Sequence, residues 1–186
     1  LVLVGRSAHA PVARKELAAL TAQGARIVTM QADISQEADV RALLDQMAAT
    51  MPPLCGIFHA AGVLDDGLLP HLDAARLRRV MASKVDGAWL LHQLTLHQEL
   101  DLFVLFSSAT SVLGAPGQAN YAAANAFLDG LAHYRRRQGL PALAINWGAW
   151  AEVGMAARPE SAAQLARQGI LAFPPQLGLA LLERCL

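Results

Sequence analysis

Short apolar runs alternate along this chain with segments whose apolar residues recur at helical spacing, and this alternation constrains the fold more than any other feature. The clearest run is Leu102–Phe106, which lacks the polar alternation of a surface strand and suits a strand buried on both faces of a parallel sheet. Strand–helix–strand repeats predict βαβ units, right-handed crossovers and a doubly wound parallel α/β sheet. Strands are predicted at Leu1–Val4, Arg26–Met30, Leu54–His59, Leu102–Phe106 and Leu143–Trp147.

The segments between these runs are predicted to be helices, and several of them end in recognisable stop signals. Gly24 closes the first helix, and the basic residues Arg135–Arg137 followed by Gly139 close a later one. Helices are predicted at Ala13–Gln23, Glu37–Thr50, Asp73–Gln98, Asn120–Arg137, Ser161–Gln168 and Gln176–Cys185.

Composition limits the classes of protein to which the chain can belong. Its 186 residues are 54% apolar and 16% charged, which indicates one folded domain over residues 1–186 rather than a disordered chain. Fifteen basic residues balance fifteen acidic ones, so no nucleic acid or membrane surface is indicated as a partner. No apolar run reaches the roughly 18 residues of a membrane span.

The cysteines and histidines show no metal-binding pattern. Cys55 and Cys185 belong to no CxxC or Cys/His cluster, and the histidines lack ligand spacing. We therefore expect no metal site and a reduced, cytoplasmic setting. Packed or surface histidines are the favoured interpretation.

Polar side chains gather around the end of the predicted strand Leu102–Phe106. Ser107 and Ser108 follow it directly, and Tyr121 and Asn125, four residues apart, share one face of the next long helix. Because ligands bind beyond the carboxyl ends of strands in open α/β sheets, these side chains are predicted to converge on a site there. The alternative is that the serines are turn or cap residues and the tyrosine an ordinary packed side chain.

Three motifs occur in order at matching spacings. They are the set Ser108, Tyr121 and Asn125, the upstream segment Ser83–Ala88, and the downstream segment Ala144–Trp150. Over the whole chain, this combination resembles the ketoreductase domain of modular polyketide synthases, in the short-chain dehydrogenase/reductase superfamily. The resemblance implies a Rossmann-like domain that uses NADPH to reduce a β-ketoacyl thioester to a β-hydroxyacyl thioester. The substrate would be carried on the phosphopantetheine arm of an acyl carrier protein, with neighbouring synthase domains as further partners.

The resemblance assigns roles to four catalytic residues. Tyr121 would give the proton, Ser108 would hydrogen-bond the substrate carbonyl, and Asn125 would hold a proton-relay water. Lys84 would hold the nicotinamide ribose and favour the Tyr121 phenolate, since a free tyrosine has a pKa of roughly 10 and a nearby cation lowers it. Most of the superfamily has lysine where this chain has Asn125 and asparagine where it has Lys84, whereas polyketide ketoreductases share the exchanged arrangement. By itself, Lys84 is also compatible with a solvated helix residue.

The resemblance also implies a cofactor side. Arg6 and Ser7 follow the first strand, where an arginine can meet the 2′-phosphate of NADPH. Asp33 and Ile34 resemble the adenine-contacting position, although Arg6 fits a surface arginine and Asp33 a helix cap as well. The small residues Ala60, Ala61 and Gly62 resemble the stretch beneath the cofactor in the family, where small side chains let the backbone approach the dinucleotide. The other predicted cofactor contacts are Ala60, Ala61, Gly62, Trp147, Gly148 and Met155.

The resemblance also implies a group of residues that would lie beside the substrate. Leu64–Asp66 resembles a fingerprint of B-type ketoreductases, which form the D-configured alcohol, and Leu113 stands where the opposite class carries tryptophan. Gln118 is assigned to the same side, and Met155–Gly169 matches the lid of the family. The alternative for the two acids is a pair of solvated turn residues.

One difference from the family's sequence pattern leaves other functions possible. No G-x-G-x-x-G turn occurs; in the family it precedes the strand with which this chain begins. We therefore expect the chain to lack a central strand with that turn, and the last strand of the sheet. The alternatives are a non-reducing scaffold derived from a ketoreductase and a short-chain dehydrogenase acting on a free small alcohol. A serine hydrolase is disfavoured because Ser108 lies in no G-x-S-x-G elbow.

Overall fold

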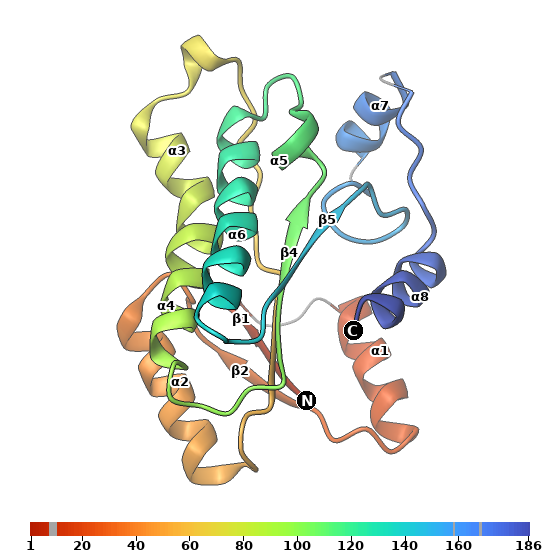
Figure 1. The fold of residues 1–186 in the computed structure, drawn as a ribbon. Helices are drawn as coiled ribbons and strands as arrows, with labels where there is room; N and C mark the ends of the chain where they lie inside the picture. Colours follow the sequence, from red (N-terminus) through yellow and green to blue (C-terminus); the bar gives the residue numbers. More distant parts are fainter. Residues whose placement is uncertain (8–10, 158, 168) are drawn as a thin grey trace.

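The computed structural model describes residues 1–7, 11–157, 159–167 and 169–186, and it confirms an α/β fold with parallel strands (Figure 1). Each predicted strand is present; the strand at Leu143–Trp147 has the predicted bounds, and the other four are shifted at one or both ends. The strands of the described part are β1 (Val2–Gly5), β2 (Val28–Gln31), β3 (Gly56–His59), β4 (Leu102–Ser108) and β5 (Leu143–Trp147).

The helices follow the predicted pattern except in the middle of the chain. The single helix predicted over Asp73–Gln98 is interrupted, because a π-helical turn, η2 (Ala82–Asp86), separates α3 (Ala74–Met81) from α4 (Gly87–Leu94). Two short helices were not predicted, namely η1 (Leu69–His71) and α5 (Thr110–Leu113). The others are α1 (Pro11–Ala22), α2 (Glu37–Thr50), α6 (Ala119–Arg137), α7 (Pro159–Arg167) and α8 (Pro175–Cys185). Gln168, the predicted end of α7, lies outside the described residues.

The strands form two parallel sheets rather than one continuous sheet. β1 pairs with β2 from Val2 opposite Val28, whereas β4 lies between β3 and β5 in a separate three-stranded sheet. No strand of the described residues joins β1 to β3.

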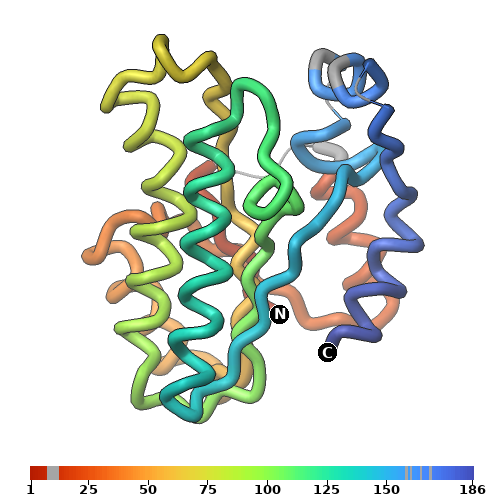
Figure 2. The backbone as a smooth tube through the Cα atoms, turned by 45° about the horizontal axis from the view of Figure 1, so that its top comes forward, coloured from red at the N-terminus to blue at the C-terminus, as the bar shows by residue number. Residues whose placement is uncertain are grey.

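Helices cover both sides of the strands. In two views, α2, α4 and α6 lie on one side, and α1 and α8 lie on the other (Figures 1 and 2). The main core lies on the first side, where Phe103 and Leu105 of β4 pack with Leu91 of α4 and Leu128 of α6. Full burial of such a side chain contributes roughly 1.5–3 kcal/mol, so this layer fixes α6 against β4. Among the described residues, no helix is both long and apolar enough to cross a membrane.

The carboxyl end of β4 lies beside the start of α6. β4 runs two residues beyond its predicted end, so Ser107 and Ser108 are strand residues, and Ser108 lies opposite Trp147 of β5. α6 packs on β4 and β5. The fold therefore brings the predicted polar set to one edge of the three-stranded sheet.

Aromatic side chains hold α8 and the preceding loop against this sheet. Trp150 packs edge-on against Trp147 and at a tilted angle against Phe173, with ring centroids 4.9 and 5.1 Å away. Ala151 N donates to Phe173 O (2.8 Å), which closes the base of the segment containing α7. α8 approaches so closely that a Cβ added at Gly178 would lie 2.3 Å from Cη2 of Trp150.

We expect Gly178→Ala to destabilise the protein by about 1–3 kcal/mol, because the added methyl group overlaps the Trp150 ring. Urea denaturation followed by circular dichroism measures the change. Gly130→Ala is the matched control on α6: a Cβ there meets no atom within 4 Å. That variant should be stabilised by roughly 0.4–1 kcal/mol. Equal stability changes in the two variants would contradict the packing of α8 on Trp150.

Candidate active site

Lys84 is buried at the centre of the candidate site. It lies on the π-helical turn η2, is 2% exposed, and donates from Nζ to Phe106 O (2.9 Å) on β4. Its Nζ also lies 5.6 Å from the centroid of the Tyr121 ring. π-helical turns are rare in proteins overall, but those that occur are frequently located at functional sites. The solvated-helix interpretation of Lys84 is therefore wrong.

Ser108, Tyr121 and Asn125 come together with Lys84, as the sequence predicted. Ser108 Oγ accepts from Thr110 N (3.2 Å) and Thr110 Oγ1 (3.0 Å) at the end of β4. Asn125 is fully buried, and its Nδ2 donates to Tyr121 O (2.8 Å) one turn earlier in α6. Its Oδ1 is buried without a partner among the described residues, which leaves an acceptor unused beside the phenol.

Burial dominates the proton equilibria of the site. Burial lowers the pKa of Lys84 to about 8, and the carboxylate of Asp129 opposes this change. Burial also raises the pKa of Tyr121, with the side chains of Asn125 and Ser108 lowering it and the charge of Asp66 raising it. The expected lowering of the Tyr121 pKa by Lys84, whose Nζ lies 5.6 Å from the ring centroid, stays a prediction. The phenol is thus held neutral, as a proton donor.

The small-residue stretch after β3 lies directly against Lys84. A Cβ added at Gly62 would lie 3.0 Å from Lys84 Cε and 3.7 Å from Met155 Cε. The structure therefore brings together three of the predicted cofactor contacts. Ala60 and Ala61 precede Gly62 after the end of β3.

The residues predicted to bind the adenosine end of the cofactor form a second group, separate from the Lys84 site. Arg6 Nη1 lies 4.0 Å from Asp33 Oδ2, and Ser7 is exposed beside Arg6. Asp33 Oδ1 accepts from Ser35 Oγ (2.7 Å), and this bond is the main cause that lowers the pKa of Asp33. Asp33 is not the cap of α2, whose N-cap residue is Gln36. In the described residues, no hydrogen bond or ion pair connects this group with the Lys84 site.

Ile34, Trp147 and Gly148 have packing roles in this structure. A Cβ at Gly87 would lie 2.9 Å from Ile34 Cδ1, so α4 packs closely on Ile34. Trp147 is 8% exposed at the end of β5, and its Nε1 has no partner among the described residues. A Cβ at Gly148 would lie 3.4 Å from Phe173. Their predicted contacts with a cofactor stay predictions.

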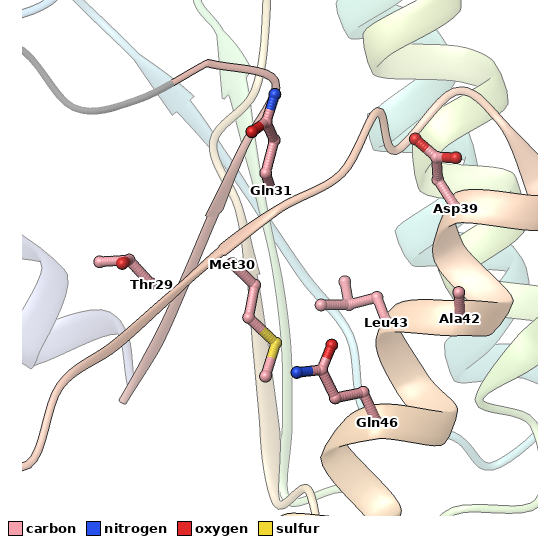
Figure 3. A pocket seen from close by; sticks show the side chains of 7 residues that line it. All are labelled: Thr29, Met30, Gln31, Asp39, Ala42, Leu43 and Gln46. Atoms are coloured by element: carbon pink, nitrogen blue, oxygen red, sulfur yellow. The ribbon is translucent and has the colours of Figure 1, made fainter.

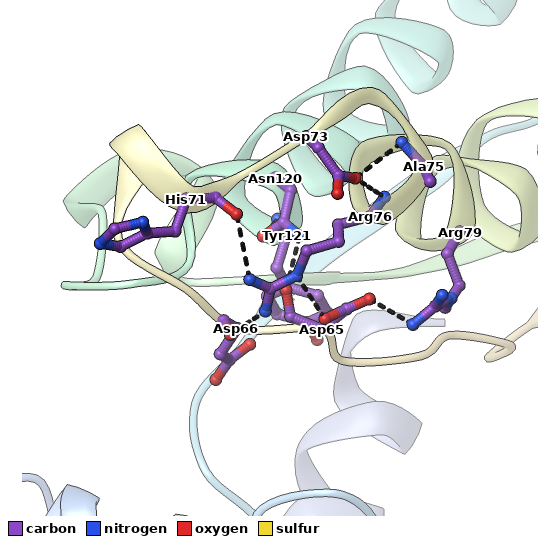
Figure 4. Close-up of polar contacts among 9 residues, drawn as sticks. All are labelled: Asp65, Asp66, His71, Asp73, Ala75, Arg76, Arg79, Asn120 and Tyr121. Atoms are coloured by element: carbon purple, nitrogen blue, oxygen red, sulfur yellow. Dashed lines mark hydrogen bonds and ion pairs between the residues drawn. The ribbon is translucent and has the colours of Figure 1, made fainter.

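The loop Leu64–Asp66 is held by arginines of α3 (Figure 4). Asp65 Oδ1 accepts from Arg76 Nε (2.8 Å), and Asp65 Oδ2 accepts from Arg79 Nη1 (2.6 Å). Arg76 also donates to the carbonyls of His71 and Asp66. The solvated-turn interpretation is therefore wrong for Asp65, whose side chain is 13% exposed.

The same loop is tied to the start of α6. Asn120 Nδ2 donates to Asp65 O (2.9 Å), while Asn120 Oδ1 accepts from Tyr121 N (2.9 Å). Gln118 Nε2 donates to Asp66 Oδ2 (2.8 Å). Leu113 lies at the end of α5 and is 82% exposed. Hydrogen bonds thus connect the loop residues Asp65 and Asp66 to the segment of Gln118 and Asn120 that immediately precedes Tyr121.

Sequence reasoning missed several residues that hold the site. Arg76 and Arg79, three apart on one helical face, were visible as a basic pair, but nothing local indicated Asp65 as their partner. Asn120 directly precedes Tyr121, and the sequence indicated for it only the start of a helix. The others are His59, Ser111, Asp129 and Asn146, which lie close to Lys84 or behind Ser108.

A cavity of about 370 Å³ lies between β2 and α2, and Lys84, Ser108, Tyr121 and Asn125 are not among its lining residues (Figure 3). It is lined by Thr29, Met30, Gln31, Asp39, Ala42, Leu43 and Gln46. None of these is a predicted site residue, so the cavity does not support the reactive site. No group of three His, Cys, Asp or Glu side chains suited to a metal ion occurs in the part of the chain that the structure describes.

Comparison with known proteins places these features in a family. A family model described as "KR domain" matches residues 1–152. The chain is 44% identical to the polyketide synthase GfsE of Streptomyces halstedii over 100% of its length, and 49% identical to the spectinabilin polyketide synthase system protein NorB of Streptomyces orinoci over 92%. It spans only 5% and 8% of these two proteins.

Solved structures agree with the sequence relatives. A structure of A-type ketoreductases from a modular polyketide synthase superposes with a TM-score of 0.91 and 44% identity. It covers 98% of this chain, which in turn covers 39% of that protein. A C2-type ketoreductase from a modular polyketide synthase superposes with a TM-score of 0.83 at 28% identity.

We expect stability to fall as the pH decreases from about 6.5 to about 4, because of His59. Burial, helped by the charge of Lys84, lowers the pKa of His59 to about 4 in the folded protein. The unfolded chain binds the proton first, so each pH unit in this window costs at most about 1.4 kcal/mol. Urea denaturation at several pH values measures the slope.

His59→Gln should weaken this pH dependence without abolishing it, because burial and the charge of Arg135 also lower the pKa of His92. His97→Gln, on an exposed histidine, should leave it unchanged. A wild-type slope that survives His59→Gln would show that other groups cause the acid destabilisation.

Proposed function

Because this chain belongs to the KR domain family, the ketoreductase domains of modular polyketide synthases, we propose that it reduces a β-ketoacyl thioester to a β-hydroxyacyl thioester with NADPH. The observation that carries the proposal is the convergence of Lys84, Ser108, Tyr121 and Asn125 at the end of β4. Reduction of a ketone needs an acid at the carbonyl oxygen and hydrogen-bond donors for the developing oxyanion.

Tyr121, Ser108 and Asn125 each have a separate role in the proposed reduction. Tyr121, whose pKa is raised by burial, is neutral and can give its proton to the alkoxide oxygen. Ser108 is held at the strand end by Thr110 and presents its hydroxyl to the same oxygen. The unused Oδ1 of Asn125 can accept a hydrogen bond from a water that returns a proton towards Tyr121.

The residues present fit a nicotinamide dinucleotide. Gly62 allows the backbone to approach Lys84, and the Lys84 ammonium can bind ribose hydroxyls once it leaves Phe106 O. The Arg6 side chain is 63% exposed and can meet a 2′-phosphate, which favours NADPH over NADH. When bound, NADPH supplies the hydride for the carbonyl carbon.

The substrate is proposed to arrive on an acyl carrier protein. The relatives GfsE and NorB are far longer than this chain, which supports a setting among other synthase domains. A tethered thioester makes delivery effectively intramolecular, so tight binding of free substrate is not needed.

We assign B-type stereochemistry, giving the D-configured alcohol, to the loop Leu64–Asp66. Asp65 is neutralised by Arg76 and Arg79, and Asp66 is bonded to Gln118, so the loop acts through its shape rather than through free carboxylates. Leu113, at the position where the opposite class carries tryptophan, supports this assignment. Chiral chromatography of the product tests it, and an L-configured alcohol would refute it.

Two other functions compete with the proposal. The division of the strands into two sheets favours a non-reducing scaffold, but the complete reactive set opposes it. A dehydrogenase for a free small alcohol is disfavoured by the exchange of Lys84 and Asn125 relative to most of the superfamily.

The experiment that tests the proposal is reduction of a synthetic β-ketoacyl thioester by the full-length protein. NADPH consumption and fluorescence titration of NADPH binding are measured together. Binding with turnover supports the reductase. A protein that binds no NADPH supports the scaffold, and turnover only with free ketones supports the small-alcohol dehydrogenase.

We expect Tyr121→Phe to lower kcat at least about 100-fold while NADPH binding and stability stay near wild type, because only the proton donor is removed. Steady-state kinetics and urea denaturation measure both effects. Tyr134→Phe, at a 46% exposed tyrosine of the same helix, is the control and should keep wild-type activity. Near wild-type activity in Tyr121→Phe would refute the assigned role.

A further inference from the structure

Arg76 of α3 bonds at three points to the chain that follows β3 (Figure 4). Its Nε donates to Asp65 Oδ1 (2.8 Å), and its Nη2 donates to Asp66 O. Its Nη1 donates to His71 O (3.2 Å). A guanidinium is a planar fork of fixed donors, so three such bonds define one position of this chain segment, which a single ammonium would not do.

Both partners of this contact are shaped for it. Asp73 caps α3, because its Oδ1 accepts from Ala75 N (2.9 Å) and from Arg76 N (2.8 Å), and this fixes the turn that carries the guanidinium. A Cβ added at Gly67 would lie 2.6 Å from Arg76 Nη1 and 2.9 Å from Arg76 Nη2. The missing side chain at Gly67 therefore lets the guanidinium lie directly on the backbone.

The chain segment held by the guanidinium also contacts the residues before Tyr121. Gly67 N donates to Gly117 O (2.7 Å). Asn120 Nδ2 donates to Asp65 O (2.9 Å), and Asn120 Oδ1 accepts from Tyr121 N (2.9 Å). The guanidinium of α3 and the start of α6 therefore hold the same few residues beside the phenol.

The place of this segment bears on which alcohol is formed. Once the ketone oxygen lies at the Tyr121 hydroxyl, half a turn of the substrate about its C=O bond exchanges the two substituents and presents the other face of the carbonyl to the hydride. The two orientations give opposite alcohols, and the site selects one only if it contacts the substituents differently. A chain segment with a fixed position beside the phenol can make that difference.

We propose that Arg76 is a positioning residue of the reductase site, which locks the segment Asp65–Gly67 against the start of α6 and thereby restricts the thioester to one of these two orientations. The inference rests on the proposed function, since it concerns the face of the ketone that receives the hydride. Arg76 acts through the segment that it holds. Its loss should therefore change which alcohol forms more than it changes cofactor binding.

Arg76→Met tests the inference, because methionine keeps an apolar stem and removes the fork of donors. The first readout is hydrogen–deuterium exchange of the full-length protein without cofactor, followed by peptide mass spectrometry. We expect exchange in peptides over residues 64–72 to become at least about tenfold faster, because the Gly67 amide loses its fixed place, while β4 keeps its wild-type rate. Unchanged exchange over residues 64–72 overturns the inference, whatever reaction the protein catalyses.

The second readout is the ratio of the two alcohols formed from a synthetic β-ketoacyl thioester, measured by chiral chromatography. We expect the share of the minor alcohol to rise about tenfold in Arg76→Met, while the affinity for NADPH stays near wild type. A lower rate with an unchanged ratio would indicate a structural role only and overturn the inference. Equal amounts of both alcohols from the wild type would overturn it as well.

Further variants separate the fork from the charge. Arg76→Lys keeps the charge without the fork, so it should behave like Arg76→Met. Gly67→Ala keeps Arg76 but displaces its guanidinium, so it should change both readouts in the same direction, and it replaces Arg76→Met if that variant does not fold. Arg78→Met, at an exposed arginine of the same helix, is the matched control and should leave both readouts unchanged.

The two proposals fail in different ways. A wild-type protein without reductase activity would refute the proposed function, and the exchange measurement would still decide whether Arg76 holds the segment. Reductase activity with wild-type exchange in Arg76→Met would refute the role of Arg76 alone.

Discussion

The burial of the Lys84 ammonium is the interaction on which the rest of the site depends. A charged group with 2% exposure is tolerated only with acceptors and a counter-charge close by. The structure supplies Phe106 O at 2.9 Å and the more distant carboxylate of Asp129. The π-helical turn at Ala82–Asp86 places the side chain there, and Gly62 leaves room for it.

The same burial sets the protonation states of the neighbours. His59 is neutral because burial, and then the charge of Lys84, lower its pKa. Tyr121 is neutral because its phenolate would lose solvation on burial. A low-dielectric site thus keeps one cation and one proton donor side by side. Both forms are the ones that a ketone reduction uses.

The approach to Tyr121 is fixed by a separate set of polar contacts. Arg76 and Arg79 hold the carboxylate of Asp65, and Asn120 joins the backbone of Asp65 to that of Tyr121. The loop therefore has a defined place relative to the Tyr121 hydroxyl, even though loops usually vary most in position. Asp65, which looks like a solvent-exposed turn residue in the sequence, is instead paired with two arginines in the loop beside the phenol.

The sequence by itself determined the order of strands and helices and indicated which residues come together in the candidate site. Apolar periodicity, glycine stops and the spacing of Ser108, Tyr121 and Asn125 are local properties, and they survive in the fold. Only the tertiary structure decided that Lys84 bonds to Phe106 O, that Asp65 pairs with two arginines, and that the strands form two sheets. These features depend on how elements far apart in the chain lie against one another, and no local pattern encodes the partner of a buried charge.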